Sequence, residues 1–443
     1  MNRFLYTIVA SLLLQGLCGN SSAQAQTQTD SLLGEPTLAH CVAYALKHFP
    51  LVQQAYLDEA ITEHQIKSKL ADWYPQISLG ANYQNNFQLP SASFNGNVVK
   101  TGTYNSSSAG LAGSQNIFNR DVLLAMRSAG DVRKQIKQVT LSDKIEVVVA
   151  VSKAFYDVLL TRKQIDLLDE DITRLSRSLK DAYNQYQGGI VDKIDYKQAT
   201  ISLNNARAEK KSYEELLKSK LVFLKQQMGY SSPGNLDLVY DSTSMEKEAI
   251  ADTSQEVRYE NRIEYQLLVT EKKLQQYNLL YNRWSFYPSV SAFAGYNFNF
   301  INDRFSRLYN QNFPNSFGGL QLSFPIFQGN KRVQNIRVAE LQVKRLDWDM
   351  ESLKNIISSQ YAQALASYKS YLYDYYTLRE NLALATEVYN TIQLQYRSGI
   401  KAYLDVITAE TSLRSAQSNY ANALYQVLSS KLDLQKALGT IQY

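Results

Sequence analysis

The residues of this chain best suited to polar chemistry lie in two short stretches that repeat each other. Residues 185–195 read QYQGGIVDKID, and residues 395–405 read QYRSGIKAYLD, so each stretch runs from a tyrosine through a glycine to an aspartate, Asp195 or Asp405. Gly supplies the positive φ that a tight chain reversal needs. An aspartate just after such a turn favours capping of the next helix, where backbone N–H groups and the helix dipole attract a carboxylate.

Patterns of catalytic or metal-binding residues are missing from the rest of the sequence. The only histidines are His40, His48 and His64, and their spacings of 8 and 16 differ from the paired helical spacing of zinc ligands. No Gly-rich phosphate loop, Ser-centred nucleophile elbow or Cys pair occurs. We therefore expect no enzymatic activity, no cofactor and no bound metal.

The charge distribution argues against a nucleic-acid partner. The formal charge is +5 over 443 residues, and acidic and basic residues alternate along the chain. A nucleic-acid surface is typically a basic stripe interleaved with aromatic residues, and no such stripe occurs here.

The repeated stretches belong to a duplication of nearly the whole chain. Residues 73–75 (WYP) return as 286–288 (FYP), and residues 116–118 (NIF) return as 325–327 (PIF). Each copy predicts the order helix, strand, loop, strand, long helix, turn, helix. We expect a signal peptide at 1–25, a first repeat at 26–230, a linker at 231–256 and a second repeat at 257–443.

Two very long helices are predicted by what the sequence omits. No proline lies between Pro90 and Pro233 or after Pro325, and glycine is nearly absent from 119–187 and 330–398. A helix of about 65 to 70 residues would be on the order of 100 Å long. Apolar residues recur every 3.5 positions, which is typical of coiled coils: Leu168, Ile172, Leu175, Leu179, Ala182 and Tyr186 in the first repeat, and Leu378, Leu382, Ala385, Tyr389, Ile392 and Tyr396 in the second. Helices at 192–228 and 403–438 would complete two antiparallel hairpins.

Three segments alternate with the period of a β-strand, at 77–83, 290–300 and 320–326. A fourth strand at 107–115 is rich in Gly and Ser, and we place it mainly by its position in the repeat. Their length suits a tilted membrane strand of about 9 to 11 residues, and Tyr83 and Tyr296 would suit an aromatic girdle. Four strands leave two bare edges that lipid does not tolerate. Because small closed barrels begin at about eight strands, we expect several copies to share one barrel, and three copies would supply about 12 strands.

The N-terminus has the layout of a secretory signal peptide. Arg3 precedes an apolar run at 4–14, and the small residues at 21–25 offer cleavage sites. Leu17 argues against lipidation of Cys18, because a small residue is preferred there. Cleavage would leave Cys41 as the only cysteine, so no intramolecular disulfide is expected. No later segment reaches the roughly 20 apolar residues of a membrane helix, so we expect strands to cross the membrane.

Together these residues resemble the TolC-like family of outer-membrane efflux proteins. The resemblance is carried by residues 45–50 (ALKHFP), 261–264 (NRIE), the tail at Leu438-Gly439, and above all 396–407 (YRSGIKAYLDVI). It implies a homotrimer in the outer membrane, mainly helical, whose duplicated units form a shared 12-stranded β-barrel continued by a long helical barrel in the periplasm. The linker would lie in a belt around the middle of that helical barrel.

The resemblance also implies roles for the two repeated stretches. The constriction of the channel would be formed by Tyr186, Asp195, Tyr396, Lys401 and Asp405, and a periplasmic adaptor would dock on the turns at Gly188, Gly189, Ile190, Ser398, Gly399 and Ile400. In a trimer Asp405 would face its own symmetry copies, which should raise its proton affinity and favour cations. Relatives often carry a second pore-facing aspartate one turn later, where this chain has Thr408, which argues against a second acidic ring.

The function implied is a passive exit duct through the outer membrane. It would take small toxic solutes or a secreted protein from an inner-membrane pump through the adaptor, and the sequence does not distinguish these cargoes. The alternative hypothesis is an envelope coiled-coil spacer or adhesin without a channel. The alternative explains the heptads but not the paired strands.

Overall fold

The computed structural model of the chain describes residues 36–231, 236, 238, 245–246 and 248–442, so the predicted signal peptide and much of the linker lie outside the described residues. The first half contributes α2 (Leu38–His48), α3 (Pro50–Ala71), β1 (Gln76–Asn85), β2 (Ser91–Phe94), β3 (Asn97–Lys100), β4 (Asn105–Phe118), α4 (Arg120–Gln187) and α5 (Lys193–Met228). The second half contributes α7 (Ile263–Arg283), β5 (Ser289–Asn302), β6 (Asn315–Ser323), α8 (Lys331–Arg397) and α9 (Tyr403–Leu438).

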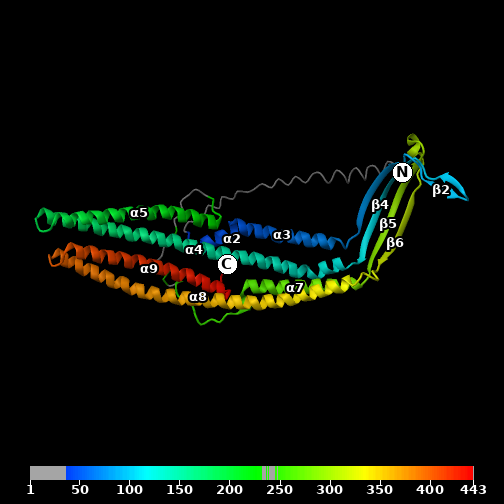
Figure 1. Cartoon of the computed structure of the whole chain (residues 1–443). Coiled ribbons are helices and arrows are strands. Elements are labelled where there is room, and N and C mark those ends of the chain that lie inside the picture. Colours follow the sequence, from blue (N-terminus) through cyan, green and yellow to red (C-terminus); the bar gives the residue numbers. More distant parts are fainter. Residues whose placement is uncertain (1–35, 232–235, 237, 239–244, 247, 443) are drawn as a thin grey trace.

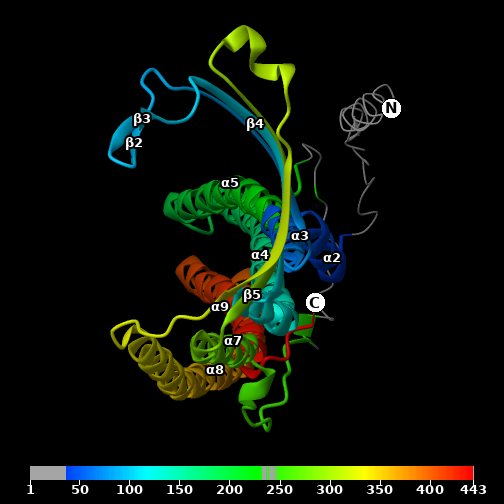
Figure 2. The same cartoon turned by 90° about the vertical axis from the view of Figure 1, so that its right-hand side faces the viewer.

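The molecule is a long helical body with a sheet at one end and, at the other, the two turns that connect α4 to α5 and α8 to α9 (Figure 1). α4 and α5 form one antiparallel hairpin, and α8 and α9 form the second, with α3 and α7 covering the sheet-ward parts of α4 and α8. Viewed from the sheet end, the helices and strands follow an open curve that does not close on itself (Figure 2).

The expected pair of very long helices is present. α4 contains 68 residues and α8 contains 67. The heptad positions Leu168, Leu175 and Ala182 of α4 are buried, as are Tyr389 and Tyr396 of α8. None of the helices among the described residues combines the length and the apolarity needed to cross a membrane.

The core is concentrated in the middle of the helical body. Val151, Val158 and Leu159 of α4 pack in one apolar cluster with Val427 and Leu428 of α9. The described part of the predicted linker joins this cluster through Leu236, Leu238, Met245 and Ala249. Tyr368 of α8 fixes this part of the linker, since the Tyr368 hydroxyl donates to the carbonyl of Ala249 at 2.9 Å and accepts from the amide of Ala251 at 2.7 Å.

One antiparallel sheet in the order β1-β4-β5-β6 contains the four predicted strands. Its central pair joins the two halves of the chain, with Asn105 opposite Asn302 at one end of the ladder and Phe118 opposite Val290 at the other. β1 and β6 are the edges of the sheet.

The predicted boundary of the last strand was wrong. We expected a strand at 320–326, whereas β6 begins at Asn315 and ends at Ser323. Pro325 explains the early end, because proline has no backbone N–H to continue a ladder.

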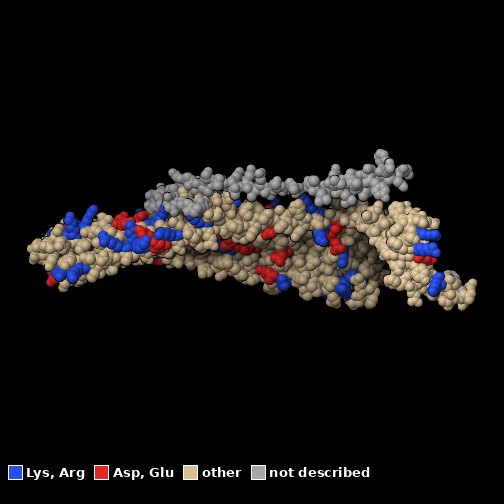
Figure 3. All heavy atoms as spheres, turned by 90° about the horizontal axis from the view of Figure 1, so that it is seen from above, with Lys and Arg blue, Asp and Glu red and all other residues tan. Residues whose placement is uncertain are grey.

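The four strands of this sheet contain no charged residue. The charges of this end lie in the connections beyond the strands, at Lys100, Asp303, Arg304 and Arg307. On the face seen in Figure 3, uncharged surface accordingly separates the charged helical body from a small charged group at the far end.

Candidate functional site: the hairpin turns and the seam between the hairpins

The two glycine turns have the same backbone structure. Gly189 has φ 71° and Gly399 has φ 73°, the left-handed conformation that glycine adopts freely. The amide of Ile190 donates to the carbonyl of Gln185 at 2.9 Å, and the amide of Ile400 donates to that of Gln395 at 2.9 Å. These are the six-to-one bonds of a Schellman motif, so each turn ends its long helix with satisfied carbonyls.

The capping interpretation was wrong for both aspartates that follow the turns. The N-cap of α5 is Asp192, whose side chain accepts from the amide of Ile194 at 3.0 Å. The N-cap of α9 is Ala402, which has no side chain that could accept such a bond. Asp195 and Asp405 lie in the first turns of these helices. They still benefit from the positive end of the helix dipole.

Lys401 and Asp405 form an ion pair within the second hairpin. Their charged atoms are 3.8 Å apart, and their side chains are 42% and 44% exposed. Such an exposed pair contributes little to stability. It does not connect the two hairpins of one chain, so a role of these residues in constricting a channel stays a prediction.

Tyr396 and Asp195 are near each other although they come from different hairpins. Tyr396 is 5% exposed. Burial raises the pKa of Tyr396 to about 12, and the nearby carboxylate of Asp195 adds to this shift. The pKa of Asp195 is itself raised, first by burial and then by Asp192. The fifth predicted residue, Tyr186, packs against Tyr196 with ring centroids 5.1 Å apart.

The turns present apolar side chains to their surroundings. Ile190 is 75% exposed and Ile400 is 73% exposed, and the next helical turns add Ile194 at 59% and Leu404 at 64%. Equivalent positions of the two repeats therefore offer two similar apolar knobs. Such patches on otherwise polar surfaces are typical of protein contact sites.

The seam between α4 and α9 contains polar contacts that the sequence interpretation missed. Ser178 donates to the hydroxyl oxygen of Tyr403 at 3.2 Å, and both residues are buried. Nearer the turns, Arg397 of α8 pairs with Asp181 of α4 at 3.5 Å. These contacts connect the two hairpins, and they depend on which helix faces meet, so no local sequence pattern would have revealed them.

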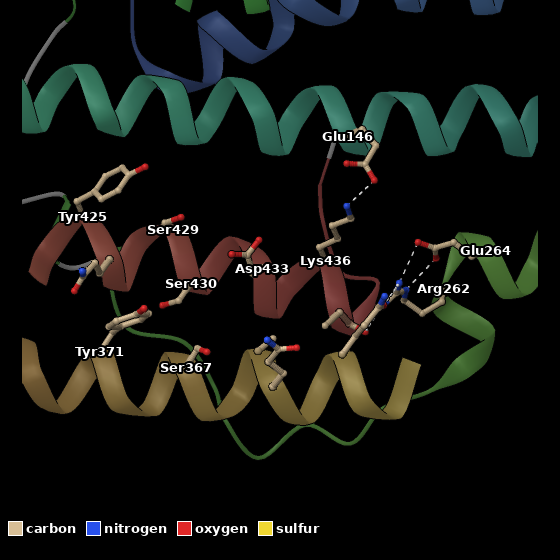
Figure 4. Close-up of a pocket in the computed structure, with 15 residues that line it drawn as sticks. Glu146, Arg262, Glu264, Ser367, Tyr371, Tyr425, Ser429, Ser430, Asp433 and Lys436 are labelled. Atoms are coloured by element: carbon tan, nitrogen blue, oxygen red, sulfur yellow. Dashed lines mark hydrogen bonds and ion pairs between the residues drawn. The ribbon is translucent and has the colours of Figure 1, made fainter. Parts of the chain in front are cut away.

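A cavity of about 670 Å³ lies further from the turns, where α4, α7, α8 and α9 meet (Figure 4). Arg262, 5% exposed, pairs with Glu264 at 3.0 Å and donates to the carbonyl of Ala437 at 3.2 Å. Across the cavity Lys436 pairs with Glu146 at 2.5 Å. The hydrogen bond from Arg262 to Ala437 and the ion pair between Lys436 and Glu146 fix the end of α9 to both halves of the chain, which assigns the polar lining a structural role.

The fold is similar to those of solved outer membrane and transmembrane channel proteins. A solved structure of CusC covers 91% of this chain and 92% of its own, with a TM-score of 0.73 and 18% identity. The structure of VceC from Vibrio cholerae covers 91% and 96%, with a TM-score of 0.71 and 14% identity.

The family model described as "Outer membrane efflux protein" matches residues 42–230 and 268–440. The chain belongs to this family. It is 20% identical to the outer membrane protein TolC of Vibrio cholerae serotype O1 over 75% of this chain and 77% of the relative. It is 21% identical to the probable efflux pump outer membrane protein TtgC of Pseudomonas putida over 91% and 83%.

The resemblance to TolC-like proteins and the expected outer-membrane location are thereby confirmed. These relatives are named as outer membrane and efflux proteins, not as enzymes. The matched ranges include both glycine turns and the residues of the seam.

Proposed function

We propose that this protein is the passive outer-membrane duct of a tripartite efflux or secretion system, and that it works as a homotrimer. Three copies would join their sheets into one barrel of about 12 strands. Their helical hairpins would continue that barrel as a tube in the periplasm.

The observation that carries the proposal is the sheet with two edges and no charge in its strands. An uncharged strand surface suits lipid, but unpaired edge strands do not. Pairing of β6 of one copy with β1 of the next would remove both edges. The open curve of the helices in Figure 2 supports the same arrangement, since a single copy encloses no lumen.

The second element of the proposal is the periplasmic end. The exposed apolar residues of the two turns, among them Ile190 and Ile400, would receive a periplasmic adaptor that connects the duct to an inner-membrane pump. The repeated Schellman turns give the adaptor six similar sites in a trimer.

The gate of the duct would lie at the same end. Tyr396, Asp195 and Tyr186 would constrict it near the turns, and Lys401 and Asp405 would line the narrowest part, where three copies of Asp405 favour cations. Small toxic solutes and a secreted protein are both cargoes that such a tube accommodates.

Reconstitution in planar bilayers tests the function. Purified protein should insert and give discrete, passive, cation-favouring conductance steps without nucleotide. A spacer or adhesin without a lumen would leave the bilayer silent and would stay soluble without detergent. Replacement of Asp405 by Asn should reduce the cation preference, and an unchanged preference would remove Asp405 from the constriction.

A further inference from the structure

Buried polar atoms without a hydrogen-bond partner collect in one part of the described structure. They are Oε1 of Glu410, Oε1 of Gln417, the hydroxyls of Tyr389 and Tyr396, and atoms of the Asp171 carboxylate and the Arg174 guanidinium, which are paired only with each other as an ion pair in this part of the seam. The only such atom elsewhere among the described side chains belongs to Ser285. All except that of Ser285 lie on the turn-ward parts of α4, α8 and α9. Since a buried unpaired polar group costs about 1 to 3 kcal/mol, this part of the seam between the hairpins is held less firmly than the rest.

The character of the α4–α9 seam changes along its length. Near the middle of the body it is apolar, with Val158 and Leu428 in the same core cluster. A polar part follows, beginning with Gln164, whose amide donates to Ser418 at 3.3 Å. Beyond it, next to the turns, Ala182 of α4 and Tyr403 of α9 belong to a second apolar cluster. The polar part is therefore the part of the seam that can separate at the lower cost in buried apolar surface.

Asp171 and Glu410 are buried carboxyl groups on the two helices of this polar part. Asp171 on α4 is 1% exposed, and Glu410 on α9 is 7% exposed. Both line a cavity of about 170 Å³ together with Ser202 and Asn205 of α5 and Arg414 of α9. Burial of a carboxyl group disfavours its ionised form.

The cations next to these carboxyl groups do not neutralise both of them fully. Arg174 forms an ion pair with Asp171 one turn away on the same helix, and its guanidinium also lies 5.9 Å from the ring centroid of Tyr389 on α8. Arg414 pairs with Glu209 of α5 at 3.5 Å, so its charge is shared with an exposed carboxylate. Glu410 therefore has the weaker compensation.

The titration of Glu410 agrees with this geometry. Burial raises the pKa of Glu410 to about 7, although Arg174 and Arg414 lower it. The proton on Glu410 is thus bound more tightly when the seam is closed than when the carboxyl is exposed to water. The contribution of the Glu410 proton to the stability of the closed seam is fully present below the ordinary pKa of 4.5 and is lost as the pH rises through about 7.

We propose that Glu410, Asp171 and Arg174 form a proton-sensitive latch between the two hairpins, which holds the periplasmic end shut when Glu410 is protonated and loosens when it ionises. The protonated carboxyl can donate a hydrogen bond to Asp171 or to the hydroxyl of Tyr389, which the ionised form cannot. This latch rests on the proposed duct and adds a second point of control above the turns, inside each chain.

The test is single-channel recording of the full-length protein between about pH 5.5 and pH 8.5, with the variants Glu410→Gln and Glu214→Gln. A pKa of about 7 in the closed seam against 4.5 when exposed shifts the ratio of open to closed states about 30-fold per subunit over this range. Glu410→Gln keeps the size and neutrality of the protonated side chain, so it should stay in the low-conductance state at both pH values. Glu214→Gln removes an exposed charge that, among the described residues, pairs with lysines of α5. The ratio of open to closed states should therefore still rise with pH in this variant.

Each outcome has a separate meaning. The latch is overturned, and the duct is left in place, if the ratio of open to closed states rises with pH as much in Glu410→Gln as in the unmodified protein. A ratio that does not change with pH in the unmodified protein has the same meaning. A rise that persists in Glu410→Gln but disappears in Asp405→Asn assigns the titration to the pore ring instead. Silence of all forms at every pH overturns the duct and the latch with it.

Amide hydrogen exchange in the first three turns of α9 gives a second readout. Protection there should fall at the higher pH in the unmodified protein and stay constant in Glu410→Gln. Equal loss of protection in both forms would contradict the latch even if the channel recordings were silent.

Discussion

The hydrogen bond from Ser178 to Tyr403 gives the sharpest prediction about how the two hairpins are held together. The side chains of Ser178 and Tyr403 are 4% and 2% exposed, and they come from α4 and α9. Tyr403→Phe removes the acceptor and leaves the Ser178 hydroxyl in a buried position. We expect the closed seam to lose about 1 kcal/mol, and up to about 3 kcal/mol if the serine finds no new partner.

A loss of about 1 kcal/mol corresponds to a roughly fivefold increase in the open-to-closed ratio per subunit. Open probability in planar bilayers measures this ratio. The double variant Ser178→Ala with Tyr403→Phe removes both polar groups, so it should be closer to the unmodified protein than Tyr403→Phe alone. Tyr373→Phe is the matched control, because Tyr373 is 73% exposed. Strict additivity of the two single changes would refute the reasoning, since it would mean that the two groups do not interact.

Two further predictions concern the hairpin turns and Gly439, the C-cap of α9. Lys401→Ala and Asp405→Ala should both raise single-channel conductance. The ion pair between these residues is exposed and lies within one chain, so it contributes at most about 0.5 kcal/mol there, and a larger effect would measure contacts between subunits. Unchanged conductance in both variants would remove the two residues from the gate. Gly439→Ala should destabilise the protein by about 2 to 4 kcal/mol, because Gly439 has φ 70° and an added Cβ would lie 2.6 Å from the carbonyl oxygen of Asn261. Gly399→Ala should cost only about 1 to 2 kcal/mol, because Gly399 has a similar φ of 73° but an added Cβ would enter open space. Thermal unfolding at one fixed scan rate compares the two glycine variants, and equal midpoints would contradict the role of the close contact.

The long helices could be predicted because their evidence is local. Missing proline and glycine, a 3.5-residue period and glycine turns all act on neighbouring residues, and α9 begins and ends where the pattern placed it, at Tyr403 and Leu438. Three of the four strands followed from their period of two, and the strand at 107–115 followed from its position in the repeat. The small hairpin β2–β3 was missed, although its turn at Asn95-Gly96, with φ 46° and 82°, is a known hairpin signal.

The seam could not be predicted, because it depends on residues far apart in the chain. Asp171 and Glu410 each look like ordinary charged positions of a helix, and only the packing of α4 against α9 buries them together. The cap of α5 was a similar case, since Asp192 and Asp195 are both plausible caps in the sequence and the local backbone selects Asp192. Local patterns specify the elements, while pairings between elements determine which polar groups lose water.

The most direct test of the central claim is the native mass of the detergent-extracted mature protein. The account requires several chains, because one sheet of four strands cannot close a barrel, and three chains would supply about 12 strands. A trimer that stays intact only in detergent is the predicted result. A monomer or dimer that remains soluble without detergent would contradict the shared barrel, and with it the duct, the gate and the latch.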